Sequence, residues 1–195
     1  MENEVKEPAP KYDFISPDEY LEMERASGEK HEYYDGHVVT LSGASKEHNF
    51  INANLIIEIG LFLKGHKCKI LPSDMRVSTP SRDAYIYPDA SIVCSELELE
   101  DNKFDTLLNP CVVFEILSPS TKKNDAGYKL LWYQHIASLK QYIMIDCKKR
   151  FVQSVIKQAD EAWRFEDITD PAGKLNIPTI DFSILLDDIY RNTGL

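Results

Sequence analysis

The sequence predicts an α/β protein in which a mixed β-sheet is flanked by helices. Segments with an apolar stripe at helical spacing alternate with short runs rich in Val, Ile and aromatic residues. Their order is helix, hairpin, helix, several strands, helix and strands again, which suits helices packed on the faces of a sheet. A length of 195 residues, with 43 % apolar and 28 % charged residues, suits one soluble globular domain with a substantial core.

The N-terminal segment leads into the first helix. Residues 1–12 are rich in acidic residues and lack an apolar stretch, which predicts a disordered lead-in and no secretory signal. Residues 13–195 are predicted to form a single domain. Ser16 and Glu19 match a capping box with proline at the first helical position, which predicts a helix over about 17–25.

A hairpin and a longer helix follow. Asp35-Gly36 separates two β-like runs at 32–34 and 38–41, which is a strong hairpin signal. Ser45 then begins a predicted helix over about 46–64. One stripe of this helix holds His48, Ile51, Leu55, Ile59 and Phe62.

The rest of the chain is predicted to be mostly strands. These strands cover 67–71, 75–79, 90–94, 111–117, 141–146, 151–158 and 162–168. Helices are predicted at about 122–137 and, closing the chain, at 181–190. No segment is long and apolar enough to span a membrane, so an integral membrane protein is excluded.

Glu115 lies inside the most apolar of the predicted strands. Burial of an unpaired charge costs at least several kcal/mol, so a buried carboxylate is normally protonated, paired or bound to a metal. Asp89 follows a proline and stands just before the strand at 90–94. Because neighbouring strands lie about 4.8 Å apart, the two carboxylates would meet if these strands pair. The alternative is that Glu115 is an ordinary salt-bridge or edge residue.

Lys129, in the next predicted helix, is placed to join them. It lies four residues after Asp125 on one helix face, from which it would point back across the carboxyl end of the Glu115 strand. Two carboxylates and a lysine suit Mg²⁺ chemistry, because Mg²⁺ prefers oxygen ligands and activates water that a lysine can orient. The alternative is a surface Asp125–Lys129 pair, worth about a few tenths of a kcal/mol.

Charge distribution leaves nucleic acid as a candidate partner. The formal net charge is −10, yet residues 122–150 hold seven Lys or Arg and two Asp, a net of +5. Local basic stripes matter more for phosphate binding than the sum over the chain. Candidate phosphate contacts are Lys122, Lys123, Arg76 and Arg82. Solvated surface lysines are the alternative.

Four cysteines and the absence of two motifs narrow the class further. Cys68, Cys94, Cys111 and Cys147 form no C-x-x-C pair, which predicts reduced residues in a cytoplasmic protein, without disulfide or zinc. The chain has no glycine-rich phosphate loop and no G-x-S-x-G elbow. Nucleotide triphosphate and serine-hydrolase chemistry are therefore disfavoured.

Read in order, these motifs resemble those of the Uma family of restriction endonucleases, within the PD-(D/E)XK nuclease superfamily. The matching stretches are HEYYDGHVVTLSGASKEH, YPDASIVC, VVFEILSPSTKKNDAGYKLLWY and QYIMID, within roughly residues 14–150. The most specific part is SPST followed by Asp125, Lys129 and Tyr133. The resemblance implies a restriction-endonuclease-like fold and a homodimer.

The resemblance also implies metal ligands. Asp89 matches the acid of the PD element and Glu115 matches the second acid. They would bind Mg²⁺, or Mn²⁺ in its place, together with the backbone carbonyl of Ile116. The superfamily often has its lysine two residues after the second acid, where this chain has Leu117, so the resemblance passes that role to Lys129.

Two further residues match positions that recur in the family. Glu32 and His48 are therefore candidate catalytic residues, either of which could reach the metal or its water. The alternative for Glu32 is a surface charge on the hairpin. The alternative for His48 is a hydrogen-bonded residue near the start of its helix, and Tyr133 is a candidate packing residue.

The sequence thus predicts an Mg²⁺-dependent endonuclease that hydrolyses phosphodiester bonds in DNA. The main alternative is a catalytically inactive module on a nuclease fold that binds nucleic acid or a protein. Metal binding that depends on Asp89 and Glu115 separates the two. A third hypothesis is an enzyme acting on another small phosphorylated substrate.

Overall fold

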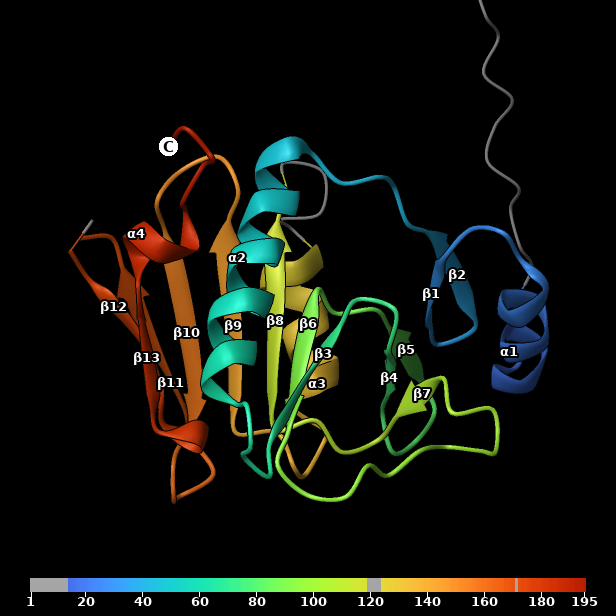
Figure 1. Cartoon of the computed structure of the whole chain (residues 1–195). Helices are drawn as coiled ribbons and strands as arrows, with labels where there is room; N and C mark the ends of the chain where they lie inside the picture. The colour runs from blue at the N-terminus through green and yellow to red at the C-terminus, as the bar shows by residue number, and fades with distance from the viewer. Residues whose placement is uncertain (1–13, 119–123, 171) are drawn as a thin grey trace, which may run out of the picture.

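The computed structural model describes residues 14–118, 124–170 and 172–195. The predicted lead-in therefore lies outside the described residues. Within those ranges no helix is long and apolar enough to cross a membrane. The helices are α1 (Pro17–Ala26), α2 (Lys46–Phe62), α3 (Leu130–Tyr133) and α4 (Leu186–Ile189), with a π-helical turn η1 (Asn124–Lys129) and a 3-10 turn η2 (Pro178–Ile180) (Figure 1).

A five-stranded sheet lies next to α1 (Figure 1). Its strand order is β2-β1-β5-β4-β7, and only the β4–β7 pair is parallel. The strands are β1 (His31–Tyr34), β2 (His37–Thr40), β4 (Arg76–Ser78), β5 (Ala84–Ile86) and β7 (Thr106–Leu107). The predicted hairpin is confirmed, since Asp35 and Gly36 both have positive φ, at 44° and 85°, as a tight turn between β1 and β2 requires.

A six-stranded sheet forms the centre of the molecule. Its strand order is β11-β10-β9-β8-β6-β3, with β8 and β9 parallel and the other pairs antiparallel. Its strands are β3 (Lys69–Pro72), β6 (Ala90–Val93), β8 (Val112–Leu117), β9 (Gln141–Asp146), β10 (Val152–Lys157) and β11 (Trp163–Ile168). A separate hairpin consists of β12 (Lys174–Ile177) and β13 (Phe182–Leu185).

Each face of the six-stranded sheet carries a hydrophobic layer. Phe114 and Ile116 of β8 face α2 and the β12–β13 hairpin, in one cluster of buried residues. Val113 and Leu117 face α3 and the five-stranded sheet, in a second cluster. Figure 1 shows α2 in front of the sheet and α3 behind it. Because side chains alternate along a strand, Glu115 shares the face of Val113 and Leu117.

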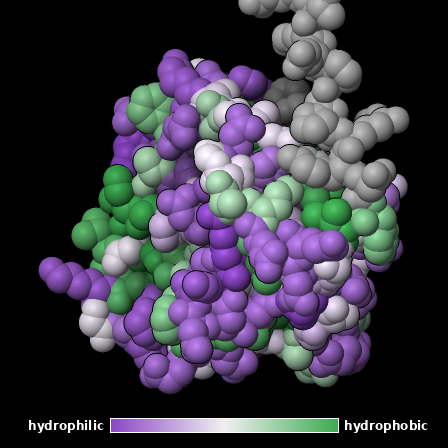
Figure 2. Space-filling model, turned by 90° about the vertical axis from the view of Figure 1, so that its right-hand side faces the viewer, coloured by the Kyte–Doolittle hydropathy of each residue, from purple (hydrophilic) through white to green (hydrophobic). Residues whose placement is uncertain are grey.

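The surface on the α1 side is largely hydrophilic. Figure 2 shows this side, with most of the surface hydrophilic and apolar areas near its left and right margins. The exposed apolar residues of α2 are Phe50, Ile57 and Leu61. The helix is thus apolar on both its inner and its outer side, which a simple amphipathic pattern does not predict.

Two predicted helices differ from the structure. In the described part of 122–137, a π-helical turn precedes the short α3, which ends at Tyr133. Within 181–190, only Leu186–Ile189 is helical, because Phe182–Leu185 pairs with β12. The strands β5, β7 and β12 were not predicted, since runs of two to four residues carry too little periodicity.

The prediction of reduced cysteines was wrong for two of the four. A disulfide joins Cys68 and Cys94, which are 26 residues apart. β3 and β6 pair with Lys69 opposite Val93, so the two cysteines face each other at the end of this ladder. Only the strand register reveals this pairing. Cys111 and Cys147 are free thiols and are buried.

We expect Leu55→Ala to destabilise the protein by about 2–5 kcal/mol, because the Leu55 side chain on the inner face of α2 is fully buried. Urea denaturation measures the free energy of unfolding. Leu61→Ala is the matched control, since Leu61 lies on the same helix with 67 % of its surface exposed. Its cost should stay within about 0.5 kcal/mol. Equal costs would show that α2 does not pack as described.

Candidate active site

Asp89 and Glu115 meet across paired strands. β6 and β8 pair antiparallel with Ala90 opposite Phe114, which places Asp89 opposite Glu115. The Asp89 N–H donates to the Phe114 carbonyl at 3.0 Å. The Ile116 N–H donates to Asp89 Oδ2 at 2.6 Å, which fixes the carboxylate beside β8. The strand pairing on which the two-carboxylate prediction depended is therefore present.

Lys129 joins Glu115 to a second buried carboxylate. Its Nζ lies 2.9 Å from Glu32 Oε1 and 3.3 Å from Glu115 Oε2. The three side chains are almost fully buried, with exposures of 6 % for Lys129 and 3 % for each glutamate. Glu115 is thus a paired buried charge, and Lys129 is no surface residue. Because β1 belongs to one sheet and β8 to the other, this lysine also bridges the two sheets.

Tyrosine hydroxyls hold both glutamates. Tyr133 donates to Glu115 Oε1 at 3.0 Å, and Tyr34 donates to Glu32 Oε2 at 2.8 Å. Burial, with Glu115 nearby, raises the pKa of Tyr133 well above its ordinary value. Burial and Glu32 do the same to the pKa of Tyr34. Both hydroxyls therefore stay protonated and act as hydrogen-bond donors.

His48 reaches the site from the start of α2. Ser45 caps this helix and accepts a hydrogen bond from the His48 N–H at 3.3 Å. The imidazole Nε2 lies 3.1 Å from Asp89 Oδ1. His48 Nδ1 is buried and has no hydrogen-bond partner within the described ranges. The histidine thus contacts the carboxylate oxygen that the Ile116 N–H leaves open.

Several of these residues line one cavity of about 590 Å³. Its lining includes Asp89, Glu115, Ile116, Lys129 and His48. The rest of the wall is mostly small or polar, and includes Ser42, Gly43, Ser45, Asn49, Asn52, Ser73 and Ser118. A polar, concave site of this size can admit a charged segment of a larger substrate.

The oxygen donors fit a hard divalent cation. Mg²⁺ typically binds one or two protein carboxylates and keeps several waters. Asp89 and Glu115 supply two carboxylates on adjacent strands, and Ile116 lines the same cavity. In the described part of the chain, no three His, Cys, Asp or Glu side chains are arranged to hold a metal by themselves. A metal here would therefore depend on backbone oxygen and water as well.

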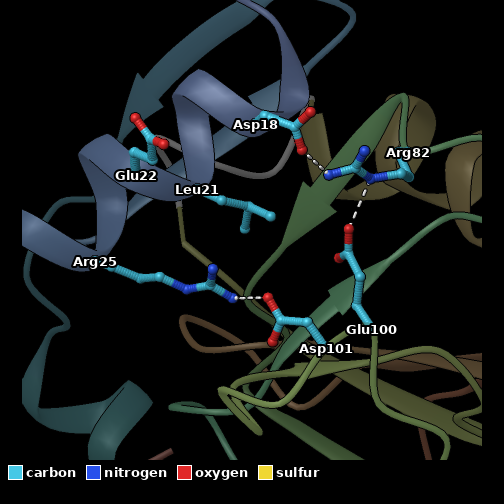
Figure 3. Close-up of a pocket in the computed structure, with 7 residues that line it drawn as sticks. All are labelled: Asp18, Leu21, Glu22, Arg25, Arg82, Glu100 and Asp101. Carbon is cyan, nitrogen blue, oxygen red and sulfur yellow. Dashed lines mark hydrogen bonds and ion pairs between the residues drawn. The ribbon is translucent and has the colours of Figure 1, made fainter.

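A second cavity, of about 520 Å³, lies away from these residues beside α1 (Figure 3). Arg25 pairs with Asp101 at 2.7 Å, and Arg82 pairs with Asp18 and Glu100. Figure 3 shows both guanidinium groups turned towards these carboxylates. The arginines of this cavity are thus neutralised and offer little to a phosphate.

One predicted phosphate contact, Arg76, is wrong, and a second, Arg82, already pairs with carboxylates. Arg76 is only 2 % exposed, bonds to Thr106 and lies 3.0 Å from Asp105. Arg82 is held by the carboxylates of the second cavity. The remaining predicted contacts, Lys122 and Lys123, and the Asp125 side chain lie outside the described residues.

Comparison with known proteins gives the family. The sequence matches the Uma2 family, described as "Putative restriction endonuclease", over residues 17–186. The chain belongs to this family. It is also 32 % identical over 184 residues to the uncharacterized protein slr1290 of Synechocystis, covering 94 % of this chain and 95 % of that protein. The Synechocystis protein sll1609 is 31 % identical over 150 residues, covering 77 % and 85 %.

A solved structure shows the fold. The crystal structure of "a putative nuclease belonging to DUF820" from Anabaena variabilis matches with a TM-score of 0.74. The match covers 90 % of this chain and 97 % of that one at 18 % identity. The Uma2 chain therefore has the restriction-endonuclease-like fold that its sequence predicts.

Sequence reasoning missed the residues that hold Glu32. Tyr34 lies two positions after Glu32, on the same face of β1, which is the one signal that could have indicated their contact. The Tyr87 N–H donates to Glu32 Oε1 at 3.1 Å, and no pattern in the sequence indicates this bond. Tyr133, considered as a packing residue, also binds the central carboxylate.

We expect Lys129→Met to destabilise the protein by about 3–5 kcal/mol near pH 7, because two buried glutamates lose their shared cation. Urea denaturation measures the loss. Lys103→Met, at an exposed position, is the control and should change stability by less than about 0.5 kcal/mol. If Lys129→Met lowered the free energy of unfolding by as little as Lys103→Met does, the buried ion cluster would be contradicted.

We expect stability to fall as pH rises above about 10, because unfolded tyrosine loses its proton there while buried Tyr133 keeps it. Each such tyrosine contributes a slope of up to about 1.4 kcal/mol per pH unit. Tyr133→Phe should remove one such contribution from the slope of unfolding free energy against pH. Tyr128→Phe, on the exposed surface, is the control. An unchanged slope in Tyr133→Phe would show that Tyr133 is not buried beside Glu115.

Proposed function

We propose that this Uma2 protein is an Mg²⁺-dependent endonuclease that hydrolyses phosphodiester bonds in DNA. The observation that carries the proposal is the convergence of Asp89, Glu115 and Lys129 in one polar cavity. Asp89 and Glu115 come from opposed positions of paired strands, and Lys129 comes from the helical segment behind them. Membership of a restriction-endonuclease family and the fold support a nuclease.

Each residue has a role in this proposal. Asp89 and Glu115, with the Ile116 carbonyl, hold the metal, which supplies positive charge to the phosphate and acidifies water. Lys129 donates a hydrogen bond that orients the attacking water. Glu32 accepts a hydrogen bond from the Lys129 ammonium and so fixes its position.

In this proposal, His48 positions Asp89. Its Nε2 contacts Asp89 Oδ1 and restrains that carboxylate, while the Ile116 N–H restrains Oδ2. With both oxygens held, Asp89 keeps one orientation towards the cavity. Restraint of this kind lowers the reorganisation needed when a cation or a phosphate arrives.

A homodimer and a cytoplasmic location remain predictions. A dimer would supply two cavities to the two strands of a duplex. Light scattering during size-exclusion chromatography measures the mass of the particle against the 22.4 kDa of one chain. A mass of one chain at working concentration would contradict the dimer and leave the site chemistry untouched.

A catalytically inactive binding module is the second candidate. The observation that favours it is the pairing of Lys129 with two carboxylates, which draws its charge away from a substrate. The acidic composition of the chain also favours this second candidate. Such a module would bind its partner without a metal and would not cleave.

We expect Glu115→Gln and Asp89→Asn to reduce plasmid nicking in Mg²⁺ by roughly 10²–10³-fold, as removal of one charge-stabilising group does. A nicking assay measures the rate, and calorimetry of Mg²⁺ and Mn²⁺ measures binding on the same samples. Glu166→Gln, on the exposed part of β11, is the matched control and should behave as wild type. Chelation of the metal should stop nicking by the wild-type protein, and added Mg²⁺ should restore it.

Two outcomes would contradict the proposal. Wild-type protein that neither binds Mg²⁺ nor nicks DNA would exclude the metal-dependent mechanism. If it still retards DNA in a gel, the binding module becomes the better description. Nicking that persists in both variants would place the reaction elsewhere on the chain or in a contaminant.

A further inference from the structure

We propose that Cys68, Cys94 and Cys111 form a thiol–disulfide exchange site in which Cys94 bonds to either of the other two. Cys94 is joined to Cys68 by a disulfide. The free thiol of Cys111 lies only 3.6 Å away, from its Sγ to the Cys94 Sγ. Cys94 therefore has a bonded sulfur on one side and a sulfur in contact on the other.

Strand pairing brings the three sulfurs together. β6 lies between β3 and β8 in the six-stranded sheet (Figure 1). Cys68 directly precedes β3, Cys94 directly follows β6 and Cys111 directly precedes β8. Since both pairings are antiparallel, these three positions fall at the same end of the sheet. Asp89 and Glu115 are placed towards the other end, so the sulfur cluster is separate from the candidate active site.

Two observations indicate which sulfur atom reacts first. Cys94 is half-buried, whereas Cys68 and Cys111 are each only 6 % exposed. The Cys111 thiol donates a hydrogen bond to the Ile92 carbonyl at 3.1 Å, which holds it beside β6. An external thiol therefore meets Cys94 first, and Cys111 is held next to the sulfur that it attacks.

The exchange is balanced without an external oxidant. The Cys111 thiolate attacks the Cys94 sulfur, a Cys94–Cys111 bond forms and the Cys68–Cys94 bond breaks. Cys68 leaves as a thiolate and takes up the proton that Cys111 released. A dithiol such as dithiothreitol opens either disulfide by supplying two electrons and two protons, and is itself oxidised to a disulfide.

Burial sets the rate of this exchange. It raises the pKa of the Cys111 thiol, so little of the reactive thiolate is present at neutral pH. The exchange is therefore slow, and it starts from the Cys68–Cys94 bond that the structure contains. The exchange would free the segment between α2 and β3 from its covalent bond to β6.

Cys68→Ser isolates the second pairing. In a glutathione redox buffer, we expect this variant to form a Cys94–Cys111 disulfide, found by mass spectrometry of peptides under non-reducing conditions. After denaturation, alkylation should then label Cys147 alone among its three cysteines. Cys147 is the internal reference, because it follows β9 at the end of the sheet where β8 also ends. The double variant Cys68→Ser/Cys111→Ser is the control and should leave Cys94 open to alkylation.

The same mapping on the wild-type protein covers the case in which the variant does not fold. Long incubation with a low concentration of reduced glutathione should yield a Cys94–Cys111 peptide beside the Cys68–Cys94 peptide. Exchange is refuted if folded Cys68→Ser keeps both Cys94 and Cys111 as thiols. For the wild type, the refuting result is a Cys68–Cys94 peptide with no Cys94–Cys111 peptide after the full incubation. The cluster would then be one fixed disulfide beside an inert thiol.

Discussion

The ammonium group of Lys129 lies between two buried glutamates, and the arrangement of the site depends on that contact. Glu32 comes from the five-stranded sheet and Glu115 from the six-stranded sheet. Each carboxylate alone would carry the cost of a buried charge, and each would repel the other. With the shared lysine, the two sheets can approach at this point. The site therefore also holds the two sheets together. Substitutions of Glu32, Glu115 or Lys129 are expected to change the stability of the protein along with any activity of the site.

The same cluster explains why a cation suits this cavity. Among the described residues, the Lys129 ammonium pairs with Glu32 and Glu115, and the Asp89 carboxylate lies opposite Glu115 on the paired strand. Tyr34 and Tyr133 donate hydrogen bonds to the glutamates without adding charge. Negative charge is therefore in excess within this set, which a divalent cation would offset. Lys129 offsets part of this charge by pairing with both glutamates.

The sequence predicted the fold class, and it named residues that the structure places near one another, but it missed several short elements and the partners of the site. Of the expected residues, Asp89, Glu115, Lys129 and His48 line one cavity, and Glu32 contacts Lys129; their catalytic roles stay predictions. Sequence motifs were enough to select these residues because few residue types can serve the proposed metal-dependent hydrolysis. The partners Tyr34 and Tyr87 depend on side-chain directions, which spacing along the chain does not encode. The short strands and the β12–β13 hairpin were missed because tertiary pairing, and not local pattern, decides them.

Strand register forms both the candidate active site and the cysteine cluster. Pairing of β6 with β8 places Asp89 opposite Glu115 at one end of these strands. The same pairing, with that of β3, brings Cys94 between Cys68 and Cys111 at the other end. A slip of one residue would turn every side chain of β6 to the opposite face, so it would separate the carboxylates and the sulfurs at once. Residues that no sequence motif connects are thus fixed by one set of backbone hydrogen bonds, whose register the buried apolar residues of both faces hold in place.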